Sequence, residues 1–126
     1  MIRILAIGNS FSQDATHYLH QIAEADRMET KVVNLYIGGC SLERHWQNIV
    51  TGAADYLYEL NGHSQERYVS VQEVLAEEAG DVIIPQQASH DSGWPDSYDP
   101  FLDNMALYIR EHCPTARLYM QKTWAY

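Results

Sequence analysis

Short apolar segments alternate with segments of helical periodicity along this chain, and this alternation restricts the possible folds more than any other feature. Residues 2–7, 31–37, 81–85 and 116–121 are mostly apolar runs of strand length. Near-continuous apolar strands are typical of a parallel sheet that is covered on both faces. Because strands and helices alternate, we expect a three-layer α/β/α architecture with a flavodoxin-like parallel sheet.

The segments between these strands place apolar residues three and four positions apart, as amphipathic helices do. Residues 11–23 predict one helix directly after the first strand, and residues 42–50 and 101–109 predict two more. The predicted buried stripes are Phe11, Ala15, Tyr18, Leu19, Ile22 and Ala23 in the first helix, Leu42, Trp46, Ile49 and Val50 in the second, and Phe101, Leu102, Met105, Ala106 and Ile109 in the third.

Turn and capping residues mark the ends of further elements. Residues 56–59 and 67–69 predict a small hairpin around Asn61-Gly62, a pair that favours a turn with positive φ. Side chains that accept hydrogen bonds from the first turn of a helix predict three helix starts. These N-caps are Ser41, Ser70 (in a capping box with Glu73) and Asp99 (followed by Pro100).

Length and composition indicate one domain over residues 1–126, with 46% apolar residues to form its core. The net charge of −9 disfavours nucleic acid and anionic membrane surfaces as partners. No apolar run is long enough to cross a bilayer, and no signal peptide precedes the first strand. Cys40 and Cys113 suggest no disulfide framework. We therefore expect a cytoplasmic protein, unless a leader has been removed.

Polar motifs follow three of the predicted strands. Gly8-Asn9-Ser10-Phe11-Ser12 follows the first, Gly39 the second, and Gln86-Gln87 the third. In open α/β sheets, ligands bind beyond the carboxyl ends of the strands, so these motifs should converge on one site. A serine between a strand and a helix is suited to nucleophilic catalysis, because unpaired backbone N–H groups surround it. The alternative is that Ser10 or Ser12 only caps the helix.

Four blocks of sequence carry a family resemblance. They are Ile7-Gly8-Asn9-Ser10-Phe11-Ser12, Gly38-Gly39-Cys40-Ser41, Gln86-Gln87-Ala88-Ser89 and Gln121-Lys122-Thr123-Trp124-Ala125-Tyr126. Together and in this order, they resemble the SGNH (GDSL-like) hydrolase superfamily, and within it a poorly characterised bacterial subgroup. The likeness covers the whole chain.

The resemblance implies a carboxylic ester hydrolase that needs no cofactor and has Ser10 as its nucleophile. The backbone N–H groups of Ser10 and Gly39 would stabilise the oxyanion of the tetrahedral intermediate. A side-chain amide completes this oxyanion hole, and most members use Asn. Here Gln86 or Gln87 would supply it, and the sequence leaves open which. The substrate would be a small or carbohydrate acyl ester.

The chain departs from the family in one block. The superfamily's last block carries an Asp and a His three residues apart, and that His is the general base for the serine. No such pair occurs at that position in these 126 residues. The resemblance therefore implies a C-terminally truncated domain, impaired or inactive by itself. Its last strand would leave Leu118, Tyr119 and Met120 as an apolar edge, through which a homo-oligomer could form.

Further residues are candidates for lining the site. His90, in the loop after the glutamine pair, could replace the missing base, although a loop histidine is more often solvated. Asn9, Trp94 and Trp124 are placed to line a pocket, and aromatic side chains there could stack on a sugar ring. Cys40 is better explained as a small buried thiol than as a nucleophile.

No metal site is predicted. His17 and His20 lie one turn apart, but no third ligand is evident, and a solvated helix face explains them better. Two functions besides the esterase remain open: a catalytically dead ligand-binding protein of the same fold, and a flavodoxin-like binder of phosphate or flavin. The chain lacks the known nucleotide-binding fingerprints, which counts against the last of these.

Overall fold

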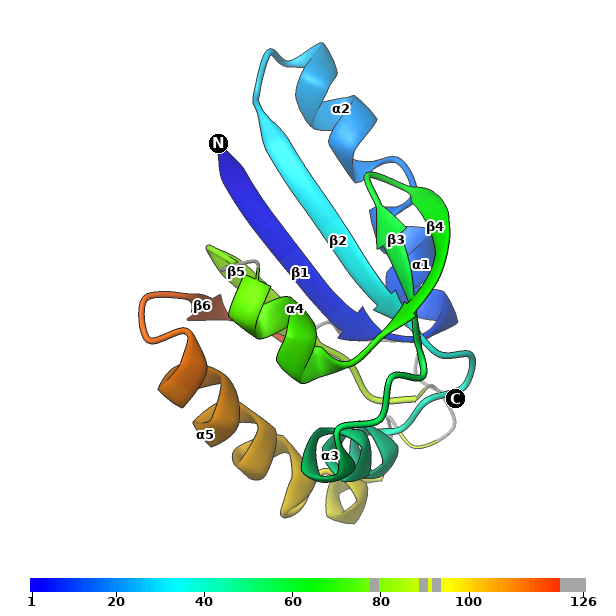
Figure 1. Ribbon diagram of the computed structural model, residues 1–126, viewed down its shortest axis with the longest axis vertical. Coiled ribbons are helices and arrows are strands. Elements are labelled where there is room, and N and C mark those ends of the chain that lie inside the picture. Colours follow the sequence, from blue (N-terminus) through cyan, green and yellow to red (C-terminus); the bar gives the residue numbers. More distant parts are fainter. Residues whose placement is uncertain (78–79, 89–90, 92–93, 121–126) are drawn as a thin grey trace.

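The computed structural model describes residues 1–77, 80–88, 91 and 94–120, and these form a six-stranded sheet with helices on both faces (Figure 1). The strand order is β4-β3-β2-β1-β5-β6. The elements are β1 (Ile2–Gly8), α1 (Ser10–Thr16), α2 (Leu19–Ala25), β2 (Thr30–Tyr36), α3 (Leu42–Thr51), β3 (Tyr56–Leu60), β4 (His63–Val69), α4 (Val71–Glu77), β5 (Val82–Pro85), η2 (Pro95–Ser97), α5 (Phe101–His112) and β6 (Arg117–Leu118).

The centre of the sheet is parallel, as the alternating sequence predicts. β1 pairs in parallel with both β2 and β5, and β6 pairs in parallel with β5. β6 is shorter than the predicted strand at 116–121 and comprises Arg117 and Leu118 alone. Among the described strands β6 forms one edge of the sheet, and Tyr119 beyond it is exposed. That this edge pairs with a second copy of the chain stays a prediction.

At its other edge the sheet is antiparallel. The predicted hairpin joins the sheet, because β3 pairs antiparallel with β2 and β4 pairs antiparallel with β3. Its turn at Asn61 and Gly62 has φ values of 52° and 87°, as the residue pair predicts. Asn61 attaches the turn to β2, donating its N–H to the Val32 carbonyl at 2.7 Å and accepting the Val32 N–H on its side chain at 2.9 Å.

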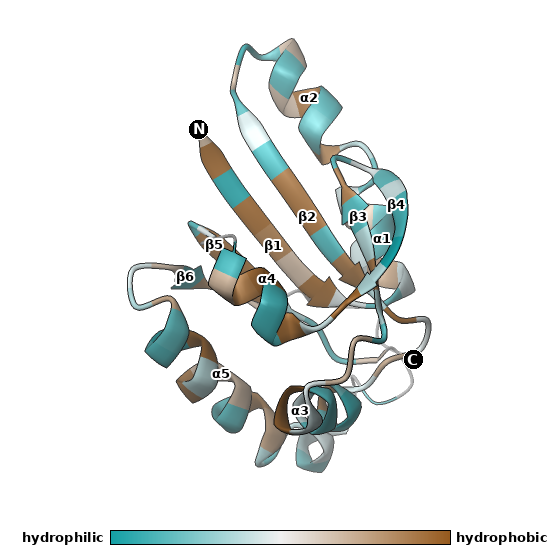
Figure 2. Cartoon of the chain, viewed as in Figure 1, coloured by the Kyte–Doolittle hydropathy of each residue, from teal (hydrophilic) through white to brown (hydrophobic). Residues whose placement is uncertain are grey.

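One face of the sheet is apolar and carries the core. Alternate residues of β1, β2 and β5 point toward α3, α4 and α5, which lie together on this face (Figure 1). Figure 2 shows the apolar residues concentrated along β1 and β2. The most deeply buried members of this core are Ile7, Leu35, Cys40, Leu42, Tyr56, Ile83, Met105 and Ile109. The predicted stripe of α5 is thereby confirmed at its two innermost positions, Met105 and Ile109.

The opposite face carries α1 and α2, and here the predicted stripe is wrong. The single helix expected over residues 11–23 is two helices, interrupted at His17 and Tyr18. Tyr18 is 64% and Ile22 63% exposed, whereas Ser12 and Thr16 are buried against the sheet. Beneath α1 the sheet itself presents polar side chains, so the polar side of the helix faces inward to satisfy them.

The predicted N-caps are confirmed at α3 and α4, and the one predicted for α5 is wrong. The side chains of Ser41 and Ser70 accept the backbone N–H groups of the residues three positions on, at 3.2 and 3.1 Å. α5 instead has Pro100 at its N-cap, so Asp99 does not cap it. The predicted buried stripe of α3 is also wrong at Val50, which is 65% exposed. His45 and Asn48 lie on the buried side of the helix instead. Among the described helices, none has the length and apolar character needed to cross a membrane.

Candidate active site

Three loops meet at the carboxyl ends of β1, β2 and β5, and the side chain of Asn9 joins them. Its Nδ2 donates to the carbonyl of Cys40, after β2, at 3.2 Å and to the carbonyl of Gln87, after β5, at 3.2 Å. Its Oδ1 accepts the N–H of Phe11 at 3.0 Å and so caps α1. Asn9 is 1% exposed, so it holds the loops together from inside rather than lining an open pocket.

The two serines of the first motif have different surroundings. Ser12 is buried and completes the capping box, because its Oγ accepts the Asn9 N–H at 3.0 Å. Its hydroxyl also lies 2.8 Å from Oδ1 of Asn34 on β2. Ser10 is exposed at the first position of α1, and its hydroxyl has no hydrogen-bond partner within the described part of the chain. Ser12, together with Asn9, therefore does the capping, which leaves the Ser10 hydroxyl available.

Gly39 lies in an exposed turn after β2, with φ at +65°, a value that favours glycine. A Cβ at this position would meet no atom within 4 Å, so the backbone conformation rather than lack of space calls for glycine. The N–H groups of Gly39 and Ser10 donate no hydrogen bond to any residue that the structure describes. Both are candidate donors to a ligand beside Ser10.

The neighbouring glutamines differ sharply. Gln87 is 1% exposed, and both ends of its carboxamide bind protein groups of the surrounding loops. Gln86 is 0% exposed, and its Oε1 and Nε2 have no partner in the described residues. Its Oε1 lies 3.0 Å from where a Cβ on Gly8 would stand, which places the amide under the start of α1. Neither carboxamide is open to solvent in this conformation.

A buried cluster behind the Gly39 turn escapes prediction from the sequence. His45 Nδ1 lies 2.8 Å from the Tyr56 hydroxyl and 3.4 Å from Cys40 Sγ. Burial lowers the pKa of His45 to about 3, with a smaller contribution from Arg44, and burial raises the pKa of Cys40 to about 12. The expectation that Cys40 is a buried thiol is confirmed, because it is 0% exposed and its high pKa opposes thiolate chemistry.

A second buried polar network lies under α1. Asn34 Nδ2 donates to Glu59 Oε1 at 2.7 Å, and Gln13 Nε2 donates to Glu59 Oε2 at 2.8 Å. Glu59, on β3, is 7% exposed. One signal for this network is visible in the sequence: Asn34 is a polar residue between Val33 and Leu35. That signal did not identify Glu59, because the hairpin was not expected to join the sheet.

A groove begins at Ser10 and runs between α1 and the β3–β4 hairpin. Its volume is about 400 Å³, and Ser10, Gln13, Asp14, His17, Glu59 and Gly62 line it. His17 is exposed, as predicted for a solvated helix face. No group of three or more His, Cys, Asp or Glu side chains able to hold a metal ion occurs in the described ranges.

The structure describes only some of the other residues that were predicted to line the site. Trp94 is 59% exposed and precedes η2. Trp46, which was predicted in the buried stripe of α3, is half-buried and packs against the core. His90 and Trp124 lie outside the described residues.

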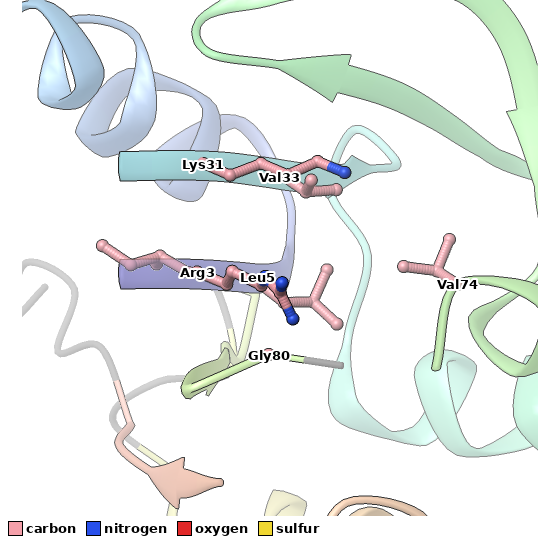
Figure 3. Close-up of a pocket in the computed structure, with 7 residues that line it drawn as sticks. Arg3, Leu5, Lys31, Val33, Val74 and Gly80 are labelled. Carbon is pink, nitrogen blue, oxygen red and sulfur yellow. The ribbon is translucent and has the colours of Figure 1, made fainter. Parts of the chain in front are cut away.

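A separate cavity at the opposite end of the sheet is unsuited to be the site. Arg3, Lys31 and Gly80 surround it at the amino ends of the strands, and Val74 of α4 faces Leu5 and Val33 across it (Figure 3). Its volume of about 20 Å³ is close to that of one water molecule. A cavity of this size cannot hold a substrate.

Comparison with known proteins gives a family and two similar structures. The family model "Domain of unknown function (DUF4886)" matches residues 3–126. A crystal structure of a DUF4886 family protein from Bacteroides uniformis is 45% identical with a TM-score of 0.91, and the match covers 99% of this chain and 51% of that one. A protein from Slackia heliotrinireducens, described as "a putative SGNH hydrolase", is 26% identical with a TM-score of 0.65, and the match covers 99% of this chain and 58% of that one. The chain thus spans little more than half the length of either structure. No curated protein matches it.

Proposed function

The chain belongs to the DUF4886 family, and we propose that the protein it represents is a serine hydrolase of the SGNH type, with Ser10 as the nucleophile. The observation that carries the proposal is that Asn9 joins the three loops that bear Ser10, Gly39 and the glutamine pair, while the Ser10 hydroxyl and the N–H groups of Ser10 and Gly39 have no partner among the described residues. The similarity to the Slackia heliotrinireducens protein supports this reaction class. A small or carbohydrate acyl ester is the proposed substrate.

The chemistry follows from what each group can donate or accept. Ser10 Oγ attacks the ester carbonyl carbon, and the carbonyl oxygen becomes an oxyanion. The N–H groups of Ser10 and Gly39 donate hydrogen bonds to this oxyanion. Such preorganised donors act where charge develops, and each contributes about 3 kcal/mol in acyl-transfer enzymes. Collapse of the intermediate expels the alcohol and leaves an acyl group on Ser10, which water then hydrolyses.

A general base must take the proton of Ser10 during the attack. No histidine of the described residues forms a hydrogen bond with Ser10. The two similar structures are considerably longer than the part that this chain matches. We assign the proposed activity to the whole protein, in which the base is an Asp-x-x-His pair of the SGNH type or His90 in the loop after β5.

The test is covalent labelling of the full-length protein with a fluorophosphonate probe, followed by mapping of the modified peptide. We expect stoichiometric modification of Ser10 and loss of ester hydrolysis in Ser10→Ala. Ser64→Ala is the matched control, because Ser64 is an exposed serine on β4 and should leave labelling unchanged. Labelling of wild type and Ser10→Ala at the same rate would exclude Ser10 as the nucleophile.

A second candidate is a ligand-binding protein without turnover. The observation that favours it is the Ser10 hydroxyl itself, which contacts no base within the described residues. This alternative predicts saturable binding of an ester by calorimetry, with no product and no probe labelling. Turnover of any ester that depends on Ser10 would rule it out.

A further inference from the structure

The Gln87 carboxamide uses its donor and acceptor groups in hydrogen bonds within the protein. A donor to an oxyanion would instead keep an N–H free for the substrate. Its Oε1 accepts the N–H of Leu42 at 2.9 Å and that of Ala88 at 2.8 Å. Its Nε2 donates to the carbonyl of Ser97 at 3.1 Å and lies 3.0 Å from the Ser97 hydroxyl. An amide has two donor hydrogens and one acceptor oxygen, so this side chain has no donor left for a ligand.

The hydrogen bond from the Leu42 N–H to Gln87 Oε1 matters most, because Leu42 adjoins the Gly39 turn. Leu42 begins α3, directly after the turn that contains Gly39. On the other side of the same segment, Asn9 Nδ2 donates to the Cys40 carbonyl at 3.2 Å. Two buried side-chain amides from neighbouring loops therefore hold the segment 40–42, one through a carbonyl and one through an N–H. The Gly39 N–H lies immediately before this fixed segment.

We propose that Gln87 is a positioning residue, which holds the Gly39 N–H in its donor orientation and does not itself donate to the substrate. The inference rests on the proposed function, because it assigns Gly39 to the oxyanion hole. A donor helps catalysis most when its direction is fixed before the reaction, so that no reorganisation is needed as charge develops. Gln87 supplies that fixation from the loop after β5, and through Ser97 it also ties the turn to η2, before α5.

Gln86 provides a matched comparison one residue away. It is as buried as Gln87, but its carboxamide has no partner in the described part of the chain. Methionine has nearly the shape of glutamine without its hydrogen-bonding groups. Gln87→Met removes every hydrogen bond of the Gln87 amide, whereas Gln86→Met makes the same chemical change and removes none. The pair separates the effect of the hydrogen bonds from that of altering a buried side chain.

The experiment measures two quantities in wild type, Gln87→Met and Gln86→Met of the full-length protein. The first is the Gly39 amide resonance, with the hydrogen-exchange rate of the Leu42 amide. The second is the rate constant for fluorophosphonate labelling of Ser10, with kcat and KM for an ester. We expect Gln87→Met to shift the Gly39 resonance, to speed exchange at Leu42, and to lower labelling and kcat about tenfold or more with little change in KM. Gln86→Met should leave the Gly39 resonance and the Leu42 exchange rate at their wild-type values, because it removes none of the hydrogen bonds that hold segment 40–42.

A third variant guards against misfolding of Gln87→Met. Gln87→Glu keeps an acceptor for Leu42 and replaces the donor to Ser97 by a carboxyl oxygen, so it should recover part of the kcat that Gln87→Met loses. Loss of labelling in Gln87→Met with an unmoved Gly39 resonance would make Gln87 a direct donor and overturn the proposal. A shifted resonance with labelling at the wild-type rate would also overturn it. If wild type itself is not labelled, the hydrolase proposal fails, and the Gly39 resonance alone then decides whether Gln87 holds the turn.

Discussion

The two faces of the sheet are built on different principles. Under α3, α4 and α5, the strands present Leu5, Ile7, Val33 and Leu35 to an apolar core. Under α1, neighbouring residues of the same strands present Asn34, and the adjoining hairpin presents Glu59, to buried polar side chains of the helix. The apolar face therefore gains its stability from the removal of surface from water, and the α1 face from hydrogen bonds that must all be made together.

The difference explains where the candidate site lies. An apolar face tolerates small displacements, because van der Waals contacts depend little on direction. The α1 face fixes directions, since Ser12, Asn9 and Asn34 hold one another through hydrogen bonds at 2.8–3.0 Å. Ser10 begins the helix that this network anchors. A helix held by directional bonds is a better support for a nucleophile than one held by apolar packing alone.

Truncation of a core side chain on the apolar face should have the largest effect. Leu35 is 0% exposed, and Leu35→Ala should lower the free energy of unfolding by about 4 kcal/mol through lost burial and the cavity that remains. Urea denaturation measures this. Leu107→Ala on α5 is the control, because Leu107 is 60% exposed and should change stability little. Equal losses in the two variants would contradict the assignment of the core to this face.

Adding one carbon to the α1 face should cost almost as much. A Cβ on Gly8 would stand 2.2 Å from Ser12 Oγ and 2.6 Å from Ser12 Cβ. Gly8→Ala should therefore displace the start of α1 and destabilise the protein by about 3 kcal/mol. It should also reduce labelling of Ser10. Gly38→Ala is the control, because its Cβ would meet only the end of the Tyr36 side chain, at 3.2 Å. A wild-type unfolding midpoint for Gly8→Ala would show that Ser12 is not held as described.

The pH dependence of stability tests the buried cluster of His45, Tyr56 and Cys40. The pKa of His45 is about 3 in the folded chain, below its ordinary 6.5, because burial disfavours the charged imidazole. The unfolded chain binds a proton near pH 6.5, so stability is full above that pH and falls as the pH drops toward 3. At pH 5 this loss should be about 2 kcal/mol relative to pH 7.5.

His45→Gln removes the titrating group and keeps a hydrogen-bonding side chain near Tyr56. Its unfolding free energy should fall less between pH 7.5 and pH 5 than that of wild type. Parallel curves for the two proteins would show that His45 is accessible to protons in the folded state.

The sequence predicts the apolar face well and the α1 face poorly, and the reason is physical. Apolar periodicity reports burial against apolar surroundings, so it identified the strands and the stripe of α5 at Met105 and Ile109. It misplaced α1, because a polar face buried against Asn34 and Glu59 has the same pattern as a solvated one. Nothing local in residues 56–69 shows that the hairpin pairs with β2, since that pairing joins segments far apart in the chain.

The candidate site, too, could be predicted from the sequence only in part. Loops converge at the carboxyl ends of parallel strands, and this rule predicts that Ser10, Gly39 and the glutamine pair lie at the same edge of the sheet. The different surroundings of Gln86 and Gln87 could not be predicted, because they depend on where Ser97 of η2 lies, ten residues beyond Gln87. Backbone topology is encoded in short patterns, whereas hydrogen-bond partners of side chains depend on the assembled loops.

The smallest expected effect distinguishes the two faces most directly. Ile22 lies in the predicted buried stripe but is 63% exposed on α2, whereas Ile109 of α5 is 0% exposed. Ile22→Ala should change the free energy of unfolding by less than about 0.5 kcal/mol, because little apolar surface returns to water. Ile109→Ala, the same substitution on the other face, should cost about 3 kcal/mol. Urea midpoints of the two variants measure the contrast. If Ile22→Ala proved as costly as Ile109→Ala, the outer side of α2 would be covered in solution, and the α1 face would have an apolar layer of its own.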